Sequence, residues 1–554
     1  MSEICGGHLV ARHIKKIEGI DTVFGLSGGH TDSIYDGCFE YDIRVVGVRH
    51  EQAATLAAHA WSIYTGKPGI AMVVPGPGFT NSLSGLVNAH FDNIPLVLIA
   101  GYPGLAQMDT GSLQHMDHVD MIKSYVKWHG RVLDVNRIGE YMSTAFSKAV
   151  TGRPGPVFLE MPTDVLRAVI DENDILPVRK GSQKYLPMPD PSSLEAAAEL
   201  INAADKPVII GGNGCLGCEE ELLEFVDKTG IPFVLMNKGR GVVSDEHPQS
   251  IWDGAQMGIY STITSADLVI GLGVRFDWAV MSGKAFPNAK MVRADIDPTE
   301  IHRNRTSDVG IVGDMKHILK GLNPLVEKMD RKAYVDGMRA GYLEMVKEEL
   351  ATRTTVADPI HPARVVELMG EVVNNDALFM VDGGDSGYFG VIGLKATEAA
   401  SVIQTGTSVF GCIGTGIPFA IGAKLARPDK TVMIVQGDGS FGFNAMEFET
   451  AVREDIPIIC VILNDKSWGM IRHGQELIYG KDRVIGTTLS DARYDKMVEA
   501  LGGYGELVEK DEDIIPAIKR AIDSGKPACI NVICDDTVVS PETLRYMAYL
   551  KGQG

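Results

Sequence analysis

Short apolar runs alternate with longer segments of helical period along the whole chain. This alternation predicts parallel β-sheets wrapped by α-helices. The strand-like runs fall into three sets: residues 21–26, 43–48, 69–74, 94–101 and 155–162; residues 207–212, 232–237, 267–273 and 291–297; and residues 377–384, 431–439, 456–465 and 528–534. Each set predicts one α/β domain built on a doubly wound parallel sheet.

Two segments without this rhythm separate the three sets. Residues 173–192 are rich in proline and polar residues, and residues 323–362 begin with Asn-Pro, pass through a charged helix-like stretch and end in ADPIHP. Such stretches are typical of linkers. We therefore expect domains at residues 1–172, 190–325 and 360–540. The first and last share a strand–helix rhythm, which makes them candidates for distant structural copies.

Charge and composition restrict the partners of the protein. The 554 residues include 52 Lys plus Arg against 72 Asp plus Glu, a formal charge of −20. Such a field repels nucleic acid and anionic lipid surfaces. No run of 18 apolar residues occurs, and charges fill the amino terminus where a signal peptide would need an apolar stretch. Together with eight cysteines in no regular framework, these features predict a cytoplasmic protein that binds neither nucleic acid nor membrane.

The strongest candidate chemistry lies in the last domain. One strand-like run leads into GDGS at residues 437–440, and the next ends in NDKS at residues 464–467. Neighbouring strand ends in a doubly wound sheet are where ligands bind, and glycines before a helix let its N–H groups approach a diphosphate. The predicted diphosphate contacts are Gly437, Gly439 and Ser440, and the predicted Mg²⁺ ligands are Asp438, Asp465 and the carbonyl of Ser467. The alternative is a tight turn followed by a helix cap.

These two motifs together resemble the thiamine diphosphate-binding motif. In that family the second strand usually ends in Asn-Asn, and the second Asn is a metal ligand. Asp465 occupies this position here, which keeps an oxygen ligand and adds a negative charge. The resemblance implies thiamine diphosphate and Mg²⁺ as cofactors. It covers nearly the whole chain, in the order pyrimidine-binding domain, middle Rossmann-like domain, diphosphate-binding domain.

The first domain contains a segment that resembles the other half of the cofactor site. The run at residues 43–48 is followed by RHEQAA at residues 49–54. In the family the Glu of this segment hydrogen-bonds N1′ of the aminopyrimidine, so that N4′ takes the proton from C2 of the thiazolium ring. Glu51 is the matching residue and should lie in a dry pocket. Taken alone, it could equally be a Glu that stabilises a helix N-terminus.

Further positions follow from the same resemblance. PGPGFTN at residues 75–81 resembles the loop that lines the cofactor cleft, and GGDS at residues 383–386 should meet the cofactor. Ile413 lies where the family places a bulky apolar residue under the cofactor. The additional cofactor contacts implied are Gly78, Asn81, Gly384, Ser386 and Ile413.

The substrate-facing segments are most similar to those of benzaldehyde lyase. His30, in FGLSGGH, matches a His that handles protons on the substrate hydroxyl, and Gln114 matches a catalytic Gln. His115 instead matches a His of pyruvate decarboxylases. The remaining predicted pocket residues are Leu26, Ser27, Trp468 and Met470, the last larger than its counterpart in the lyase. Without this framework His30 would be a turn residue. His115 and His118 have a spacing that also suits a metal site, but QHMDHVD is more typical of a solvated helix face.

The resemblance implies a lyase or carboligase acting on 2-hydroxyketones and aldehydes. The alternatives are an acetolactate synthase-like enzyme, a 2-oxo acid decarboxylase, a 2-hydroxyacyl-CoA lyase, and, from another class, a non-catalytic subunit. Relatives place the cofactor between two chains, which implies a homodimer at least and favours a homotetramer. FAD or ADP in the middle domain is possible but not favoured. The Cys215–Cys218 pair is more typical of free thiols than of a zinc site.

Overall fold

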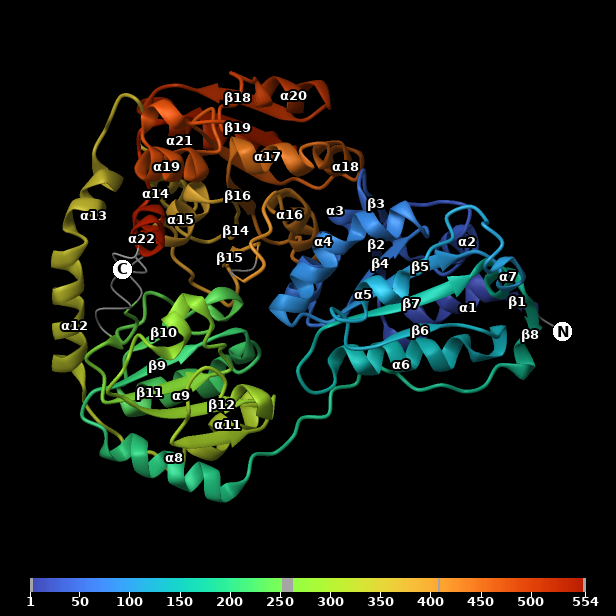
Figure 1. The fold of residues 1–554 in the computed structure, drawn as a ribbon, viewed down its shortest axis with the longest axis horizontal. Helices are drawn as coiled ribbons and strands as arrows, with labels where there is room; N and C mark the ends of the chain where they lie inside the picture. The colour runs from blue at the N-terminus through green and yellow to red at the C-terminus, as the bar shows by residue number, and fades with distance from the viewer. Residues whose placement is uncertain (1–2, 252–262, 407–408, 552–554) are drawn as a thin grey trace. The chain divides into compact units, whose positions relative to one another are not determined.

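The computed structural model describes residues 3–251, 263–406 and 409–551. These residues form two compact units (Figure 1). Unit 1 comprises Met1–Tyr185, Phe410–Asp429 and Asn444–Ile458, and unit 2 comprises Leu186–Val409, Lys430–Phe443 and Ile459–Gly554.

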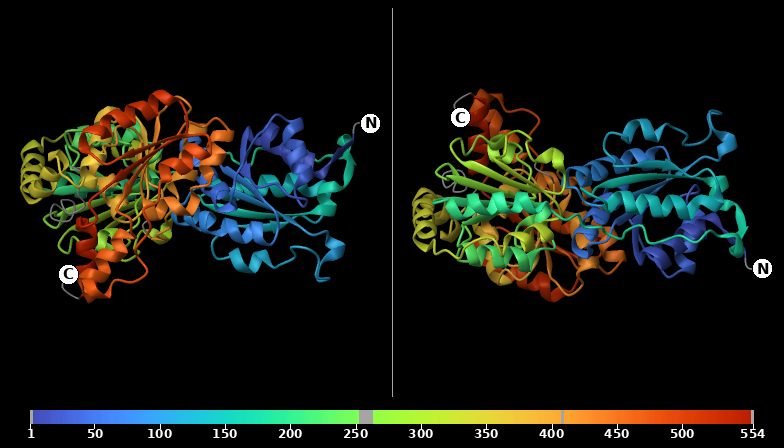
Figure 2. Two further views of the ribbon diagram at one scale, coloured as in Figure 1. Left: turned by 90° about the horizontal axis from the view of Figure 1, so that it is seen from above. Right: turned by 90° about the horizontal axis from the view of Figure 1, so that it is seen from below.

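Unit 1 is built on a six-stranded parallel sheet of order β3-β2-β4-β5-β7-β6. Helices cover both faces of this sheet (Figures 1 and 2), so its central strands are buried along their whole length. The strands are β2 (Thr22–Gly25), β3 (Arg44–Gly47), β4 (Gly69–Val73), β5 (Leu96–Tyr102), β6 (His129–Arg131) and β7 (Pro156–Pro162). The main helices are α1 (Gly6–Arg12), α2 (Asp32–Glu40), α3 (Glu51–Thr65), α4 (Pro77–Asp92), α5 (His118–Ile122), α6 (Ile138–Val150) and α7 (Thr163–Arg167).

Two helices from late in the sequence also belong to unit 1. They are α16 (Gly416–Ala426) and α18 (Glu447–Arg453). Helix α16 packs against α3 so closely that a Cβ on Gly422 would lie 2.1 Å from the carbonyl oxygen of Ala57. At the far edge of the unit, β1 (Glu3–Cys5) and β8 (Val169–Asp171) form a short antiparallel ribbon.

Unit 2 contains a five-stranded and a six-stranded parallel sheet. The five-stranded sheet has the order β10-β9-β11-β12-β13, with β9 (Pro207–Gly211), β10 (Phe233–Leu235), β11 (Leu268–Leu272), β12 (Lys290–Asp295) and β13 (Val309–Val312). Its helices include α8 (Pro191–Ala203), α9 (Glu219–Thr229) and α11 (Met315–Leu322). The predicted second linker contains two further helices, α12 (Lys332–Met345) and α13 (Lys347–Thr354).

The six-stranded sheet of unit 2 has the order β15-β14-β16-β17-β19-β18. The strands are β14 (Leu378–Val381), β15 (Val402–Gln404), β16 (Val432–Gly437), β17 (Ile459–Asn464), β18 (Tyr504–Val508) and β19 (Ala528–Ile533). The associated helices are α14 (Pro362–Val372), α15 (Asp385–Gly393), α17 (Asp438–Asn444), α19 (Gly469–Tyr479), α20 (Tyr494–Ala500), α21 (Asp511–Ser524) and α22 (Pro541–Leu550). Aliphatic side chains from this sheet and from α14 and α21 form a continuous core.

The predicted fold class, three α/β domains with parallel sheets, is confirmed. Each predicted run contains a strand. The parallel strands that the pattern missed are β6, β13, β15 and β18, and each is the outermost strand of its sheet. Edge strands are often partly exposed, and β6 and β18 accordingly lack a continuous apolar run.

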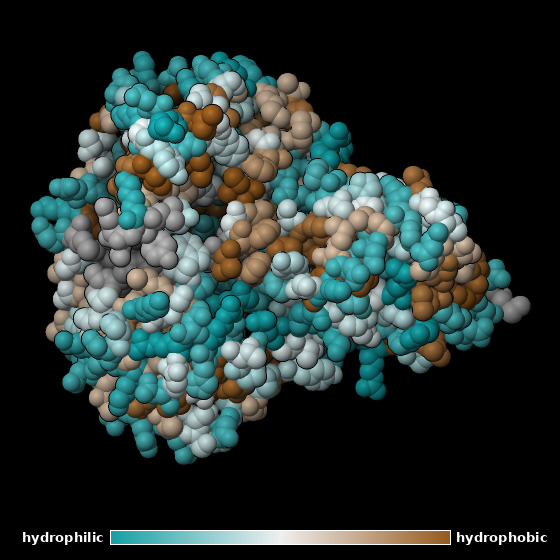
Figure 3. Space-filling view, viewed as in Figure 1, coloured by the Kyte–Doolittle hydropathy of each residue, from teal (hydrophilic) through white to brown (hydrophobic). Residues whose placement is uncertain are grey.

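The described helices do not include one with the length and apolarity needed to cross a membrane. The face drawn in Figure 3 is a mixture of hydrophilic and hydrophobic residues.

Candidate active site

Glu51 is the first residue of α3 and is only 6% exposed. Its Oε2 accepts a hydrogen bond of 3.0 Å from the side-chain amide of Asn81 on α4. A Cβ placed on Gly78, in the first turn of α4, would lie 3.4 Å from Oε1 of Glu51. The structure therefore brings these three predicted residues together around a carboxyl group that is shielded from water.

Glu447, on α18, holds the turn that leads into Glu51. The side chain of Glu447 is buried and accepts hydrogen bonds from the backbone N–H groups of Arg49 and His50, both at 3.0 Å, and from Thr450 at 2.7 Å. Burial raises the pKa of Glu447, and these hydrogen bonds partly offset that shift. The sequence pattern missed this residue because its partners lie almost 400 positions away and its own segment carries no motif.

The predicted substrate residues of unit 1 lie where β2, β4 and β5 end. His30 follows β2 and packs at the end of β5, where a Cβ on Gly101 would lie 2.7 Å from the Cβ of His30. Burial, helped by the charge of Arg167, lowers the pKa of half-buried His30. Leu26, half-buried, and Ser27, exposed, directly follow β2.

Gln114 and His115 lie on the segment between β5 and α5. Gln114 has a left-handed backbone with φ 62° and packs against Gly76, on which a Cβ would lie 3.2 Å from that of Gln114. The ring of His115 lies 5.5 Å from that of Tyr102 at the end of β5. Both side chains are half-buried.

The assignment of His118 to a solvated helix face is wrong. His118 is fully buried. Its Nε2 accepts the Gly76 N–H at 3.0 Å, and its Nδ1 lies 2.9 Å from Oε1 of Glu160. Spacing within QHMDHVD did not show that the ring points inward, because its partners come from β7 and from the turn before α4.

In unit 2, the strands β14, β16 and β17 are neighbours, and the predicted diphosphate and metal residues lie at their carboxyl ends. Asp438, the first residue of α17, is 2% exposed, and its Oδ2 has no hydrogen-bond partner. Burial and the nearby carboxylate of Asp465 raise the pKa of Asp438 to about 8. Burial also raises the pKa of Asp465. A buried and a half-buried carboxyl group close together form a site that a divalent cation would stabilise.

The turn after β17 is fixed by Asp465 itself. Its Oδ1 accepts the N–H of Ser467 at 3.0 Å, and a Cβ on Gly469 would lie 2.2 Å from its Oδ2. A side chain at the start of α19 would therefore displace the Asp465 carboxylate. Ser467 is almost fully buried beside this carboxyl group.

Glycines form a close-packed cradle at the ends of β14 and β16. A Cβ on Gly383 would lie 2.4 Å from Oγ of Ser386 and 3.2 Å from Oγ of Ser440. Gly383 also has φ 104°, a conformation that favours glycine. Because these positions are glycines, they carry no side chain that would cover the serine hydroxyls or the first N–H groups of α15 and α17. Such hydroxyl and N–H donors are what a diphosphate site requires.

The predicted pocket residues of unit 2 cover this cradle. The ring of Trp468 lies 2.7 Å from the position of a Cβ on Gly439, and the side chain of Met470 lies 2.9 Å from that of a Cβ on Gly384. Gly437 faces Ser386, whose Oγ would be 3.2 Å from a Cβ there.

Asp385, the residue after Gly384, connects the cradle to the C-terminal helix. Its carboxylate accepts hydrogen bonds from Ser540 and Thr543 at the start of α22 and lies 2.9 Å from Nδ1 of His473. Burial disfavours the charged form of His473, but Asp385 and the carbonyl of Asp536 outweigh it and raise the pKa of His473. Helices α15, α19 and α22 are held together by this buried group.

The residues of unit 2 fit a metal–diphosphate group. Within the described part of the chain no cluster of three or more His, Cys, Asp and Glu residues forms a metal site. A cation held by Asp438 and Asp465 would need other oxygens, and the carbonyl of Ser467 and a diphosphate are suited to supply them. The chemistry of the donors thus agrees with Mg²⁺ bound together with a diphosphate.

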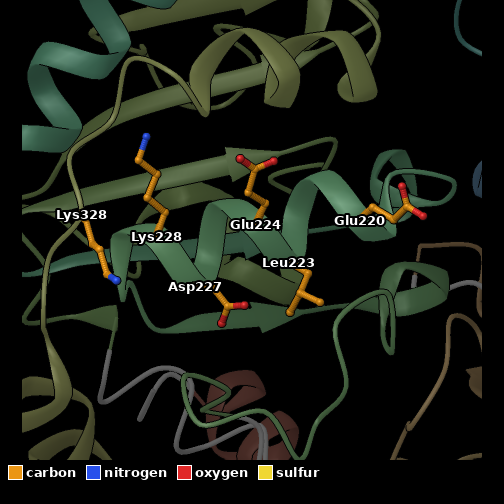
Figure 4. A pocket seen from close by; sticks show the side chains of 6 residues that line it. All are labelled: Glu220, Leu223, Glu224, Asp227, Lys228 and Lys328. Carbon is orange, nitrogen blue, oxygen red and sulfur yellow. The ribbon is translucent and has the colours of Figure 1, made fainter.

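Other predicted positions have ordinary surroundings. Ile413 is half-buried and belongs to unit 1. Cys215 and Cys218 are buried, and their thiols lie 3.4 and 2.9 Å from the carbonyls of Leu272 and Cys215. A surface pocket on α9 contains none of the predicted site residues (Figure 4); it is lined by Glu220, Leu223, Glu224, Asp227, Lys228 and Lys328.

A buried carboxyl group at the end of one doubly wound sheet, and a glycine cradle with paired aspartates at the end of another, define an enzyme that uses a diphosphate cofactor. Three family models match the chain: the N-terminal TPP binding domain of thiamine pyrophosphate enzymes at residues 4–121, their central domain at residues 194–322, and their C-terminal TPP binding domain at residues 382–532. The chain belongs to the thiamine pyrophosphate enzyme family.

Full-length relatives carry two kinds of name. The acetolactate synthase large subunit IlvG of Mycobacterium tuberculosis is 34% identical over 97% of this chain and 96% of its own. The 2-hydroxyacyl-CoA lyase of Arabidopsis thaliana is 30% identical over 96% of both chains. The acetolactate synthase isozyme 3 large subunit of Escherichia coli is 29% identical over 100% of this chain and 98% of its own.

Proposed function

We propose that this enzyme uses thiamine diphosphate and Mg²⁺ to cleave or form the carbon–carbon bond of 2-hydroxyketones and aldehydes, as a lyase or carboligase. The bound cofactor supplies the electron sink that bond-making next to a carbonyl needs. The roles proposed for the chain are activation of the aminopyrimidine by Glu51, proton transfer on the substrate by His30 and Gln114, and Mg²⁺ binding by Asp438, Asp465 and Ser467.

The observation that supports this proposal most directly is the state of His30. Its lowered pKa keeps the imidazole neutral near pH 7, so that it can accept a proton. It lies at the strand ends that also carry the buried Glu51 turn and the Gln114 segment. When the carbon–carbon bond of a 2-hydroxyketone breaks, the hydroxyl group becomes an aldehyde and must lose its proton, and a neutral, half-buried base suits that proton transfer.

The Glu51 site supports proton transfer in a dry environment. Its hydrogen-bonded neighbour Asn81 carries an uncharged amide, so the carboxyl group of Glu51 would be the proton-exchanging group at a bound aminopyrimidine nitrogen. Asn81 and Gly78 would orient and admit the ring. In unit 2 the serine hydroxyls and helix N-termini would bind the diphosphate.

A second candidate is an acetolactate synthase-like or 2-oxo acid decarboxylase activity. The names of the relatives favour it, as do His115 beside Tyr102 and the bulky Met470 against the cradle. The name of the Arabidopsis relative adds cleavage of a 2-hydroxyacyl-CoA. We do not propose a nucleotide in the middle domain.

Product analysis separates these activities. The holoenzyme is incubated with benzoin or acetoin-type hydroxyketones in one series, and with pyruvate and related 2-oxo acids in the other. Aldehyde release without carbon dioxide would support the lyase, with His30→Gln strongly impaired and His115→Gln mildly. Carbon dioxide release, with the opposite order of the two variants, would contradict it and support the second candidate.

We also propose a homodimer as the smallest active form and a homotetramer as the assembled enzyme. The support is the family resemblance, in which the two halves of a cofactor site come from two chains. Light scattering coupled to gel filtration, with and without cofactor, tests this. A fully active monomer would contradict it.

A further inference from the structure

His118, Glu160 and Arg131 form a hydrogen-bonded chain beneath the predicted site of unit 1. Nδ1 of His118 lies 2.9 Å from Oε1 of Glu160, and Oε2 of Glu160 accepts from Nε of Arg131 at 2.7 Å. The side chains of His118 and Glu160 are completely buried, and that of Arg131 is 23% exposed. The chain ends at the backbone of Gly76, whose N–H lies 3.0 Å from Nε2 of His118.

The direction of these hydrogen bonds fixes the protonation of His118. A backbone N–H can only donate, so Nε2 must carry a lone pair toward Gly76. Nδ1 then carries the ring proton and donates a hydrogen bond to the carboxylate of Glu160. The negative charge of Glu160 is balanced by Arg131. The rings of Phe79 and Tyr102 lie 4.4 and 5.8 Å from the imidazole and help to exclude water. His118 is therefore a neutral acceptor for one particular N–H group.

That N–H group lies between two predicted reacting residues. Gly76 has φ 63° and ψ −116°, a conformation reserved for glycine. On one side it packs against Gln114, with 3.2 Å between a Cβ on Gly76 and the Gln114 Cβ. Two residues further on, a Cβ on Gly78 would lie 3.4 Å from Oε1 of Glu51.

We infer that His118 is a positioning residue of the active site, which holds the Val74–Gly78 turn through the Gly76 N–H and so sets the places of Gln114 and Glu51. The part concerning catalysis rests on the proposed function, because Gln114 and Glu51 are reacting groups only there. The part concerning the turn rests on the hydrogen bonds alone.

A pair of isosteric variants separates the two ends of the ring. In His118→Asn the side-chain amide overlays Nδ1, so it can still donate to Glu160 but offers nothing to Gly76. In His118→Gln the side-chain carbonyl overlays Nε2 and can accept the Gly76 N–H again. If His118 only fills space and pairs with Glu160, His118→Asn should disturb the protein less than His118→Gln. If His118 positions the turn, His118→Gln should disturb it less than His118→Asn.

The hydrogen-exchange rate of the Gly76 amide measures directly, without substrate, how well the turn is held. Because Pro75 and Pro77 have no N–H, Gly76 carries the one amide between Val74 and Gly78. We expect this amide to exchange about tenfold faster in His118→Asn and close to the wild-type rate in His118→Gln. Unchanged exchange in the Asn variant, or equal acceleration in both, would overturn the inference.

A change at the other end of the chain provides an independent test should His118→Asn fail to fold. In Glu160→Gln the side-chain amide oxygen can still accept a hydrogen bond from Arg131. In that orientation the side-chain NH₂ of the glutamine points toward Nδ1 of His118. The ring proton must then move to Nε2, where it opposes the Gly76 N–H. Faster exchange at Gly76 is expected, and wild-type exchange would overturn the inference.

Kinetics of the holoenzyme test the catalytic part. We expect His118→Asn to lower kcat by about 10- to 100-fold with KM changed by less than about threefold, and His118→Gln to restore most of kcat. His129→Asn, on the exposed start of β6, is the matched control. Normal kcat with accelerated exchange would overturn the catalytic part alone. Absence of turnover in the wild type would instead count against the proposed function, while the exchange result still decides the role of His118 in the turn.

Discussion

The first and last sheets of this protein have the same strand order. In both, the first strand pairs with the second on one side and the third on the other, the fourth follows, and the sixth lies between the fourth and the fifth. Yet the residues at their carboxyl ends differ completely. The first sheet presents a carboxyl group beside neutral amide and imidazole groups, and the last presents paired aspartates, serines and glycines.

This difference shows what a shared topology leaves open. The strand order places loops at one edge of each sheet, and the side chains on those loops decide whether the edge handles protons or binds a charged group. Even buried carboxyl groups differ within one sheet. Glu51 accepts a hydrogen bond from an uncharged amide, whereas Glu160 is hydrogen-bonded on both oxygens, to His118 and to Arg131.

The largest effect is expected from removing the acid at the first sheet. Glu51→Gln should lower kcat by about 10²- to 10⁴-fold, because an amide cannot exchange a proton with the aminopyrimidine. The affinity for thiamine diphosphate should change little, since the proposed diphosphate site lies at the other sheet. Steady-state kinetics and cofactor titration check both, with exposed Glu40→Gln as control. Undiminished turnover would exclude the proposed role of Glu51.

The converse result is expected at the last sheet. Asp438→Asn should weaken the joint binding of Mg²⁺ and thiamine diphosphate by about 10- to 100-fold, because one of the two proposed charged ligands is lost. A chelator added to the wild type should reproduce the loss. Calorimetric titration measures it, with exposed Asp482→Asn as the matched variant. Equal cofactor affinity in Asp438→Asn and Asp482→Asn would contradict the proposal that the last sheet binds the metal and the diphosphate.

A smaller effect is expected in the pH profile. Because burial lowers the pKa of His30, its imidazole stays neutral until the pH falls below about 6.5. Hydroxyketone cleavage should therefore decline only on the acid side of that value, as protonation removes the base. The decline should disappear in the residual activity of His30→Gln. If the activity of that variant still declined at acid pH as in the wild type, the decline would be caused by another group.

The smallest effect concerns a carboxylate of unit 1 with a structural role. Burial would raise the pKa of Glu18, but hydrogen bonds from His13 and from the N–H groups of Gly181 and Ser182 outweigh it, and the pKa is lowered. A depressed pKa stabilises the fold above the unfolded value of about 4.3, and this contribution is lost as pH falls through the folded value.

Glu18→Gln should accordingly lower the free energy of unfolding by about 1–2 kcal/mol at pH 7, and the difference from wild type should shrink in acid. Urea titrations at several pH values measure this. Catalysis should be unaffected, which contrasts with Glu51 in the same unit. A pH-independent difference would show that packing, not charge, explains the loss.

The strand pattern predicted the interior of the fold better than its margins. Fully buried strands such as β5 and β16 are continuous apolar runs, whereas β6 reads His-Gly-Arg and β18 contains a glutamate. The charged helix-like stretch expected within the second linker corresponds to two helices, α12 and α13.

Motifs identified the residues at strand ends but not the residues that support them. Glu51 and Asp438 lie in recognisable segments, because the chemistry requires particular residue types next to glycines and strand ends. His118 and Glu447 act through backbone N–H groups far away in the sequence, so their roles depend on tertiary structure. No local pattern marks such a residue.

The interleaving of the two units limits how this gene can be rearranged. Helices α16 and α18 pack in unit 1, while the strands on either side of them in sequence, β15, β16 and β17, belong to unit 2. A fragment that begins after the second linker would contain strands of unit 2 together with two helices of unit 1 that lack their packing partners. Exchange of segments between homologous genes should therefore succeed only when the first and last thirds are inherited together, whereas the middle third, whose sheet is continuous in sequence, is the natural module for recombination.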